Sequence, residues 1–230
     1  MKWRKLVVGL MSSLLLFGGC TILPGAYQAE PIEGWVVDAD TGKPLEGVNI
    51  AASWELMTSG GFSTIPVGSI MLMETVTDAK GRYAFPAWGP LARNQGALLE
   101  QSPRLVFFKT GYRGEDRMND YVEPRYGGRI RRSDWNGKTI KLELFKGSFK
   151  EYAQQLDHLV TILGGFSHNE PCGWKKMPQM ILSLTDLRQS FRAQKISSGL
   201  LSVDDYIFDE SQTPGWCGGG VKQFFEEQKK

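Results

Sequence analysis

The sequence is poor in histidine and lacks the common motifs of catalytic chemistry. Its two histidines, His158 and His168, stand in neither a Gly-x-Ser-x-Gly nor a His-Glu-x-x-His frame. A phosphate-binding loop and a dinucleotide-binding fingerprint are also missing. These absences argue against nucleotide-dependent enzymes and zinc proteases. We therefore expect a protein that is not an enzyme and that binds no cofactor.

Long hydrophobic runs are missing too. The apolar stretch near the amino terminus, Leu6 to Phe17, has 12 residues, whereas a membrane-spanning helix needs about 20. Three cationic residues precede this stretch, Lys2, Arg4 and Lys5. Two glycines follow it, Gly18 and Gly19. A cationic start, a short apolar run and small residues in this order are typical of a secretory signal peptide.

Cys20 comes directly after these glycines and makes the segment resemble the signal of bacterial lipoproteins. In that family the cysteine sulfur receives a diacylglyceryl group, the chain is cut before the cysteine, and the new amino terminus is acylated. Phe17 stands where the family usually has leucine. The resemblance implies a signal peptide at 1–19, a lipidated Cys20 and a tether at 20–32. Because Thr21 rather than aspartate follows the cysteine, it also implies anchoring at the periplasmic face of the outer membrane.

The sequence has no strong excess of charge of either sign. Its 27 basic and 25 acidic residues give a net charge of +2, and without the three cations of the signal peptide 24 basic residues remain, giving −1. A nearly neutral chain has no global field that attracts nucleic acid. We therefore expect no nucleic-acid partner. The expected partners are the membrane, through the lipid on Cys20, and a protein.

Cysteine is scarce, with three residues in the chain. If Cys20 carries lipid, Cys172 and Cys217 remain as a pair in an oxidising compartment, where a disulfide between them is expected. Such a bond would close a loop of about 45 residues, for which the chain-entropy model gives about 4 kcal/mol. Two alternatives stay open: a metal site that includes His158 or His168, and a Cys172 nucleophile paired with His168.

The first half of the chain has the alternation and the turn residues of β-strands. Strands are predicted at 35–37, 48–52, 75–77, 83–85, 105–108 and 140–144. The segment from Asp78 to Gly81 has aspartate first and glycine last, which is typical of a tight turn. It predicts a hairpin between the strands that flank it.

Three of these segments occur in the order "VVDADTGKPLEGVNI", "TVTDAKGRYAFP" and "LVFFKTGYR", and together they resemble the carboxypeptidase regulatory-like domain. That family is a small antiparallel β-sandwich related to transthyretin, and it serves as an accessory module without catalytic residues of its own. The resemblance covers about 33–145, with insertions at 54–70 and 113–136. It implies a mainly β fold with a transthyretin-like sandwich domain at 33–146.

The rest of the chain, 147–230, has apolar residues at helical spacing. One stripe begins at Phe149, and Gly164 with Gly165 is expected to end that helix. A second stripe begins near Pro178, since proline is favoured in the first turn of a helix.

A capping pair, Ser202 with Asp205, is typical of the start of a short helical turn. We expect a small α-helical region that packs on the sandwich and is held by the disulfide. Any concave surface should then lie at the junction of the two parts.

Basic side chains gather in the second insertion and in the strand after it. Four of them are candidates for binding an anionic surface, such as lipid head groups or wall polymer: Arg125, Arg129, Arg131 and Arg132. The alternative is a solvated loop beside an edge strand that lysines protect from pairing.

Together these patterns predict a non-catalytic lipoprotein that presents a β-sandwich to a protein partner or supports the cell envelope structurally. The first alternative is carbohydrate or envelope-polymer binding, with Trp54, Trp88 or Trp135 as stacking platforms, although these residues suit a core equally well. The second alternative is a hydrolase built around His168.

Overall fold

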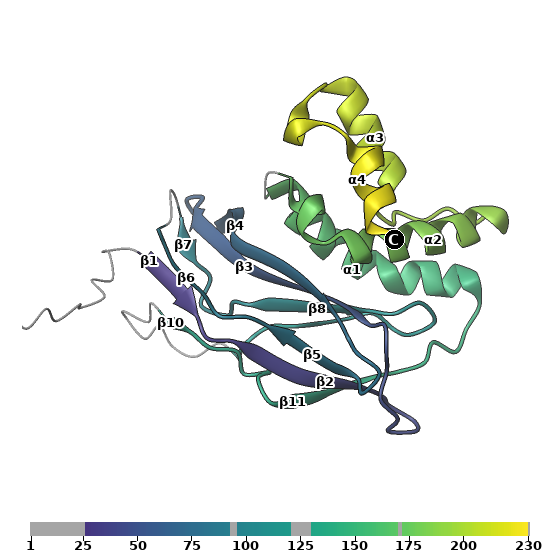
Figure 1. The fold of residues 1–230 in the computed structure, drawn as a ribbon, viewed down its shortest axis with the longest axis horizontal. Coiled ribbons are helices and arrows are strands. Elements are labelled where there is room, and N and C mark those ends of the chain that lie inside the picture. Colours follow the sequence, from purple (N-terminus) through teal and green to yellow (C-terminus); the bar gives the residue numbers. More distant parts are fainter. Residues whose placement is uncertain (1–25, 93–95, 121–129, 170–171, 230) are drawn as a thin grey trace, which may run out of the picture.

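The computed structural model describes residues 26–92, 96–120, 130–169 and 172–229. It has three layers, in which two small sheets lie against one face of a larger sheet and helices cover the other face (Figure 1). The fold is therefore mainly β with helices towards the carboxyl end, as the sequence predicts.

The two small sheets form the first layer, with strand orders β10-β1-β6 and β11-β2-β5. Their strands are β1 (Ala26–Ala29), β2 (Ile32–Asp38), β5 (Arg82–Phe85), β6 (Trp88–Ala92), β10 (Ile130–Arg131) and β11 (Lys138–Leu142). β1 lies within 20–32, so the folded part begins before the boundary predicted at residue 33. The reason is that both β6 and β10 pair with β1.

Two strand pairs in this layer are parallel. β11 runs parallel to β2, and β10 runs parallel to β1. The prediction of an antiparallel sandwich is wrong for these two pairs. Between β2 and β11 the chain passes through the larger sheet, and a connection of that length allows a strand to return in the same direction.

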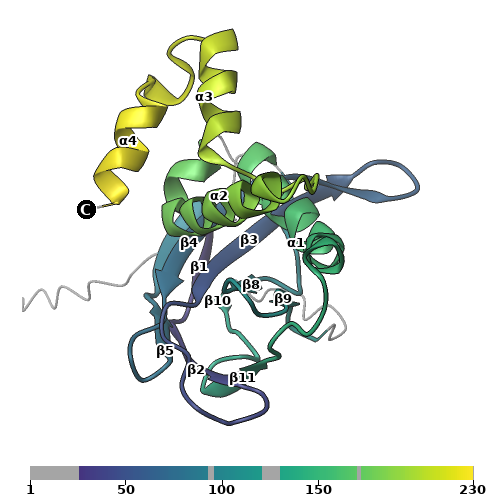
Figure 2. The same cartoon turned by 90° about the vertical axis from the view of Figure 1, so that its right-hand side faces the viewer.

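The larger sheet forms the middle layer, in the order β4-β3-β8-β9, with β7 pairing to β3. Its strands are β3 (Asn49–Ser59), β4 (Thr64–Val76), β7 (Ala97–Leu98), β8 (Arg104–Phe108) and β9 (Glu115–Arg117). β3 and β4 form a long antiparallel hairpin whose end projects beyond the rest of the sheet (Figure 2).

The turn from Asp78 to Gly81 forms as predicted, but it does not close a hairpin. The Gly81 N–H donates to the Asp78 carbonyl at 2.8 Å, and Gly81 has a φ of +71°. β4 before the turn pairs with β3, whereas β5 after it pairs with β2. The turn thus carries the chain from the middle layer to the small sheets, because β5 finds its hydrogen-bond partner there.

β8 is buried on both faces. Leu105 and Phe107 pack among the side chains between the sheets, while Val106 and Phe108 pack among those of the helical layer. A strand in a middle layer has no solvated face, so its sequence is continuously apolar rather than alternating. This accounts for the unbroken apolar run at 105–108.

The helical layer contains four α-helices and two short 3₁₀ turns among the described residues. They are α1 (Phe149–Asn169), η1 (Gly173–Lys176), α2 (Pro178–Ala193), α3 (Val203–Gln212), η2 (Trp216–Gly218) and α4 (Val221–Gln228). In the described part of the chain, no helix combines the length and the apolar character needed to cross a membrane. The capping box of Ser202 and Asp205 at the start of α3 is confirmed.

α1 continues through Gly164 and Gly165 to Asn169, so the prediction that these glycines end the helix is wrong. Each glycine costs a helix about 1 kcal/mol relative to alanine. Leu163 and Phe166 on either side are almost fully buried in the core beneath the helices. Tertiary packing of these two side chains outweighs the local preference.

Glu74 of β4 binds the start of α2 and so joins the middle layer to the helices. Its Oε1 accepts the N–H of Met180 at 2.6 Å, and its Oε2 accepts the N–H of Gln179 at 2.9 Å. These N–H groups have no acceptor within the helix, so a carboxylate at this end is favourable. Burial nevertheless raises the pKa of Glu74 to about 7, against the lowering effect of the two hydrogen bonds.

We expect the protein to lose stability as the pH rises from about 5 to about 7. Because the pKa of Glu74 is raised above its ordinary 4.5, the folded state still holds the proton at pH values where the unfolded state has lost it. The free energy of unfolding should therefore fall by about 2–3 kcal/mol across this range. Urea unfolding of Glu74→Gln at a series of pH values should show a flatter profile. Glu226→Gln removes an exposed carboxylate from α4 as a control, and equal profiles for both variants would contradict the assignment.

Candidate functional site

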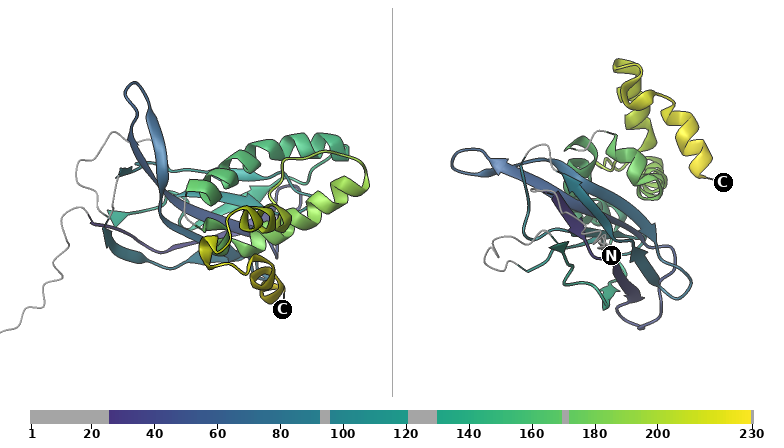
Figure 3. Two further views of the ribbon diagram at one scale, coloured as in Figure 1. Left: turned by 90° about the horizontal axis from the view of Figure 1, so that it is seen from above. Right: turned by 60° about the vertical axis from the view of Figure 1, so that its left-hand side comes forward.

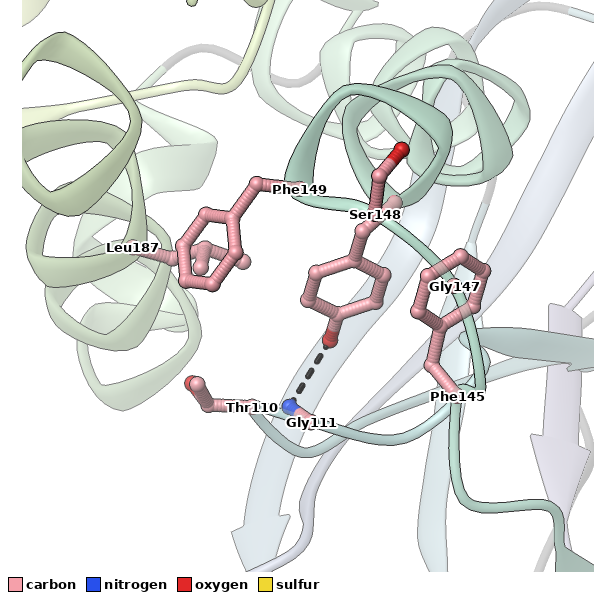
Figure 4. A pocket seen from close by; sticks show the side chains of 8 residues that line it. Thr110, Gly111, Phe145, Gly147, Ser148, Phe149 and Leu187 are labelled. Carbon is pink, nitrogen blue, oxygen red and sulfur yellow. Dashed lines mark hydrogen bonds between the residues drawn. The ribbon is translucent and has the colours of Figure 1, made fainter. Parts of the chain in front are cut away.

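A small pocket lies at the junction of the sandwich and the helices, where the sequence predicts a concave surface. Its volume is about 170 Å³. Eight residues line it (Figure 4): Thr110, Gly111, Phe145, Gly147, Ser148, Phe149, Tyr152 and Leu187. We call it the junction pocket.

Three parts of the chain build the junction pocket. One wall follows the end of β8, another is the connection from β11 to α1, and Leu187 projects from α2. The connection is held by a capping box at the start of α1. The Ser148 N–H donates to Glu151 Oε2 at 2.7 Å, and the Glu151 N–H donates to Ser148 Oγ at 3.3 Å. The bonds from Ser148 lower the pKa of Glu151. The Ser-x-x-Glu spacing at 148–151 is a sequence signal for this helix start, and the prediction of the helix did not use it.

Tyr152 provides one polar group of the pocket, besides the hydroxyl groups of Thr110 and Ser148, and its hydrogen bonds are satisfied. Its hydroxyl accepts the Gly111 N–H at 2.9 Å, drawn as a dashed line in Figure 4, and donates to the Tyr112 carbonyl at 2.9 Å. The ring stacks on Phe145 with centroids 4.7 Å apart. Burial raises the pKa of Tyr152 to about 12. The hydroxyl therefore stays protonated and fully hydrogen-bonded, which suits a wall of a binding pocket and not a reacting group.

The opening of the junction pocket combines an exposed apolar side chain with ion pairs. Phe149 lines the pocket and is 41% exposed. The Arg113 guanidinium lies over the ring of Phe145, another lining residue, and pairs with Glu143 at 3.4 Å. Lys146, between two lining residues in the chain, pairs with Asp40 at 2.8 Å. An apolar centre surrounded by charged groups is the arrangement found in many protein–protein interfaces.

A second hollow of about 200 Å³ lies at the end of α3. Asp209, Gln212, Thr213 and Trp216 line it. Trp216 is 38% exposed. Trp216 is not among the tryptophans predicted as stacking platforms, which are Trp54, Trp88 and Trp135.

The tryptophans proposed as stacking platforms lie mostly in the core. Trp54 and Trp88 are buried and pack edge to face with centroids 5.4 Å apart. Neither can stack on a ligand that arrives from solvent. Trp135 is half-buried, and its Nε1 donates to the Met118 carbonyl at 2.8 Å.

The arginines proposed to bind an anionic surface are only partly described. Arg125 and Arg129 lie outside the described residues. Arg131 is buried and bonds to Glu100 at 3.2 Å, and Arg132 bonds to Glu30 at 2.9 Å. Each described arginine thus has its own carboxylate, and the anionic-surface site stays a prediction.

The predicted disulfide is confirmed, since Cys172 and Cys217 are bonded with their Cα atoms 5.4 Å apart. Cys172 is therefore neither a nucleophile nor a metal ligand. His158 Nε2 lies 3.0 Å from Asp116 Oδ1 on the surface. Cys20 and the side chain of His168 lie outside the described residues. Within the part of the chain that the structure describes, no group of three or more His, Cys, Asp or Glu is placed to hold a metal.

Comparisons with known proteins give weak likenesses only. No family model and no curated protein matches the chain. Catechol 1,2-dioxygenase from Pseudomonas arvilla C-1 is 17% identical, with 53% of this chain and 54% of that chain covered and a TM-score of 0.30. 3-Chlorocatechol 1,2-dioxygenase from Rhodococcus opacus 1CP is 14% identical, with 53% of this chain and 61% of that chain covered and a TM-score of 0.31. The streptococcal ancillary pilin is 13% identical, with 53% of this chain and 31% of that chain covered and a TM-score of 0.27.

The matched part spans about half the length of the first of these dioxygenases, 54%. Likenesses at this level assign no activity, ligand or partner to the chain.

Proposed function

We propose that the protein is a non-catalytic lipoprotein, attached through Cys20 to the periplasmic face of the outer membrane, that binds a protein partner at the junction pocket. In this proposal the β layers are a carboxypeptidase regulatory-like sandwich of the transthyretin type. The signal-like segment before Cys20 supports the anchor, and the three motifs in the first half of the chain support the sandwich type.

The junction pocket is the observation that carries the binding role. Its walls are mainly aromatic and aliphatic, and the Tyr152 hydroxyl that faces it already has both a donor and an acceptor. A pocket of about 170 Å³ accepts one large apolar side chain but is small for a typical small-molecule ligand, since such sites usually measure about 300–1,000 Å³. We therefore assign it to an apolar side chain of a protein partner, with the exposed lining residue Phe149 as a contact.

Site-specific crosslinking tests this assignment on the lipid-anchored protein. A photoreactive phenylalanine analogue in place of Phe149 should crosslink to one reproducible partner in intact envelopes. The same analogue in place of Leu91 is the matched control, because Leu91 is also partly exposed but lies on β6. The binding role would be refuted if both positions crosslinked to the same proteins, or if position 149 gave no crosslink.

Phe149→Glu should weaken the complex with that partner at least tenfold. Apolar anchors at the centre of an interface can contribute about 2 kcal/mol or more, on the order of a 30-fold change in affinity, and a glutamate here would place a charge at the apolar opening of the pocket. Phe149 lines the pocket and is 41% exposed, so the change should leave the fold intact, as circular dichroism can verify. Affinity within twofold of the original protein would contradict the binding role of this pocket.

A further inference from the structure

The β3–β4 hairpin carries an unusual uncharged segment. Between Glu55 and Glu74 the chain has no Asp, Glu, Lys, Arg or His at any of positions 56–73. These residues form the outer part of β3, most of β4 and the turn between them. We call this segment the arm. It projects from the middle layer in two perpendicular views (Figures 2 and 3).

The end of the arm is apolar and open to solvent. Phe62 at the turn is fully exposed, at 112%, and Ile65 is 47% exposed. Proteins usually protect projecting edge strands with charged side chains, because unpaired strand edges and apolar tips promote association. The inner residues of the arm pack against the core, but 59–66 are exposed and equally uncharged. The absence of charge at this exposed end therefore points to a surface that covers it.

The base of the arm lies at the same end of the sandwich as the start of the described chain (Figure 1), and the arm projects sideways from there (Figure 2). The Leu98 N–H donates to the Tyr27 hydroxyl at 3.5 Å, and Leu98 pairs with Leu56 at the base of the arm. The segment from Cys20 to Ala26 spans at most about 20 Å when fully extended. The stretch from Leu56 to Phe62 also reaches about 20 Å at 3.3 Å per residue.

We infer that the arm is a second membrane contact, whose tip inserts Phe62 into the surface of the same bilayer that holds the lipid anchor. This inference rests on the proposed tether at Cys20, because a tether of that length keeps this end of the sandwich close to the bilayer. An uncharged arm loses no ion solvation when it enters the head-group region, and an aromatic side chain at its tip gains from burial. The arm and the tether together hold the sandwich in one orientation.

The arm alone is tested without the lipid. The chain lacking residues 1–19 and carrying Cys20→Ser is mixed with vesicles of phosphatidylethanolamine and phosphatidylglycerol at 3:1, and the bound fraction is measured by flotation. Phe62→Ser should lower the partition coefficient about tenfold, as expected when one aromatic side chain is no longer buried. Phe208→Ser is the matched control, since Phe208 is 62% exposed on α3, and it should change partitioning by less than twofold.

The tethered protein gives the second measurement. An environment-sensitive fluorophore on Phe62→Cys should be quenched by lipids that carry a spin label, whereas the same fluorophore on Phe208→Cys should be quenched by aqueous iodide. Equal iodide quenching at both positions would overturn the inference, and so would self-association of the lipid-free chain that Phe62→Ser abolishes. Mass spectrometry that finds no acyl group on Cys20 would refute the tether, and that result is separate from the flotation result for the arm.

Discussion

Trp174→Ala is expected to lower the free energy of unfolding by about 3–5 kcal/mol, the usual cost of removing a large aromatic side chain from a core. Trp174 is 1% exposed. Its ring lies 5.2 Å from that of Phe224, 5.6 Å from that of Phe225 and 5.8 Å from that of Tyr206. Trp174 belongs to η1, whereas its neighbours belong to α3 and α4. One side chain therefore holds three helical elements together.

Urea unfolding followed by circular dichroism measures this loss. Trp216→Ala is the matched control, because it removes the same side chain from the other end of the disulfide, where Trp216 is 38% exposed. We expect a loss below about 1 kcal/mol there. Losses of similar size at Trp174 and Trp216 would contradict the assignment of Trp174 as the central core residue of this region.

Removal of the disulfide by Cys172→Ser with Cys217→Ser is expected to cost about 4 kcal/mol, because the bond closes a long loop in the unfolded chain. The sequence separation of the two cysteines is 45 residues. In the folded state the bond connects the segment before η1 to η2, and Lys175 Nζ donates to the Cys217 carbonyl beside it. The loss of stability should therefore appear first in the helices that follow α2, namely α3 and α4.

Hydrogen exchange and thermal unfolding test this prediction. Amides of α3 and α4 should lose protection in the double variant, while those of β3 and β8 keep theirs, since the two sheet layers share a separate core. A reducing agent should destabilise the original protein and leave the double variant unchanged. Stability of the reduced protein within about 1 kcal/mol of the oxidised form would refute the stated role of the bond.

Several features could be predicted from short stretches of sequence, because neighbouring residues determine them. The capping box of Ser202 and Asp205 needs only a spacing of three residues and two local hydrogen bonds. The turn at 78–81 needs a glycine that accepts a positive φ. The disulfide followed from counting cysteines once Cys20 was set aside for lipid, and no distance had to be known.

Other features depended on contacts between residues far apart in the chain. The turn at 78–81 has the residues of a hairpin, yet β5 joins β2 because the acceptors and donors that fit it are there. Gly164 and Gly165 would stop an isolated helix, but the burial of Leu163 and Phe166 keeps α1 intact. Arg131 reads as a surface cation, yet the fold buries its side chain and pairs it with Glu100 from another segment.

By itself the sequence determined β2, β3, β5, β8 and β11, the end of β4, the starts of α1, α2 and α3 and the covalent link, since each of these is encoded by residue type and spacing over a few positions. Only the tertiary structure decided which tryptophans are covered, how the layers are stacked and where the junction pocket opens. Thr110, Tyr152 and Leu187 meet in that pocket from three separate segments. Their meeting results from the packing of the helical layer on the middle sheet, and no local pattern in the chain encodes it.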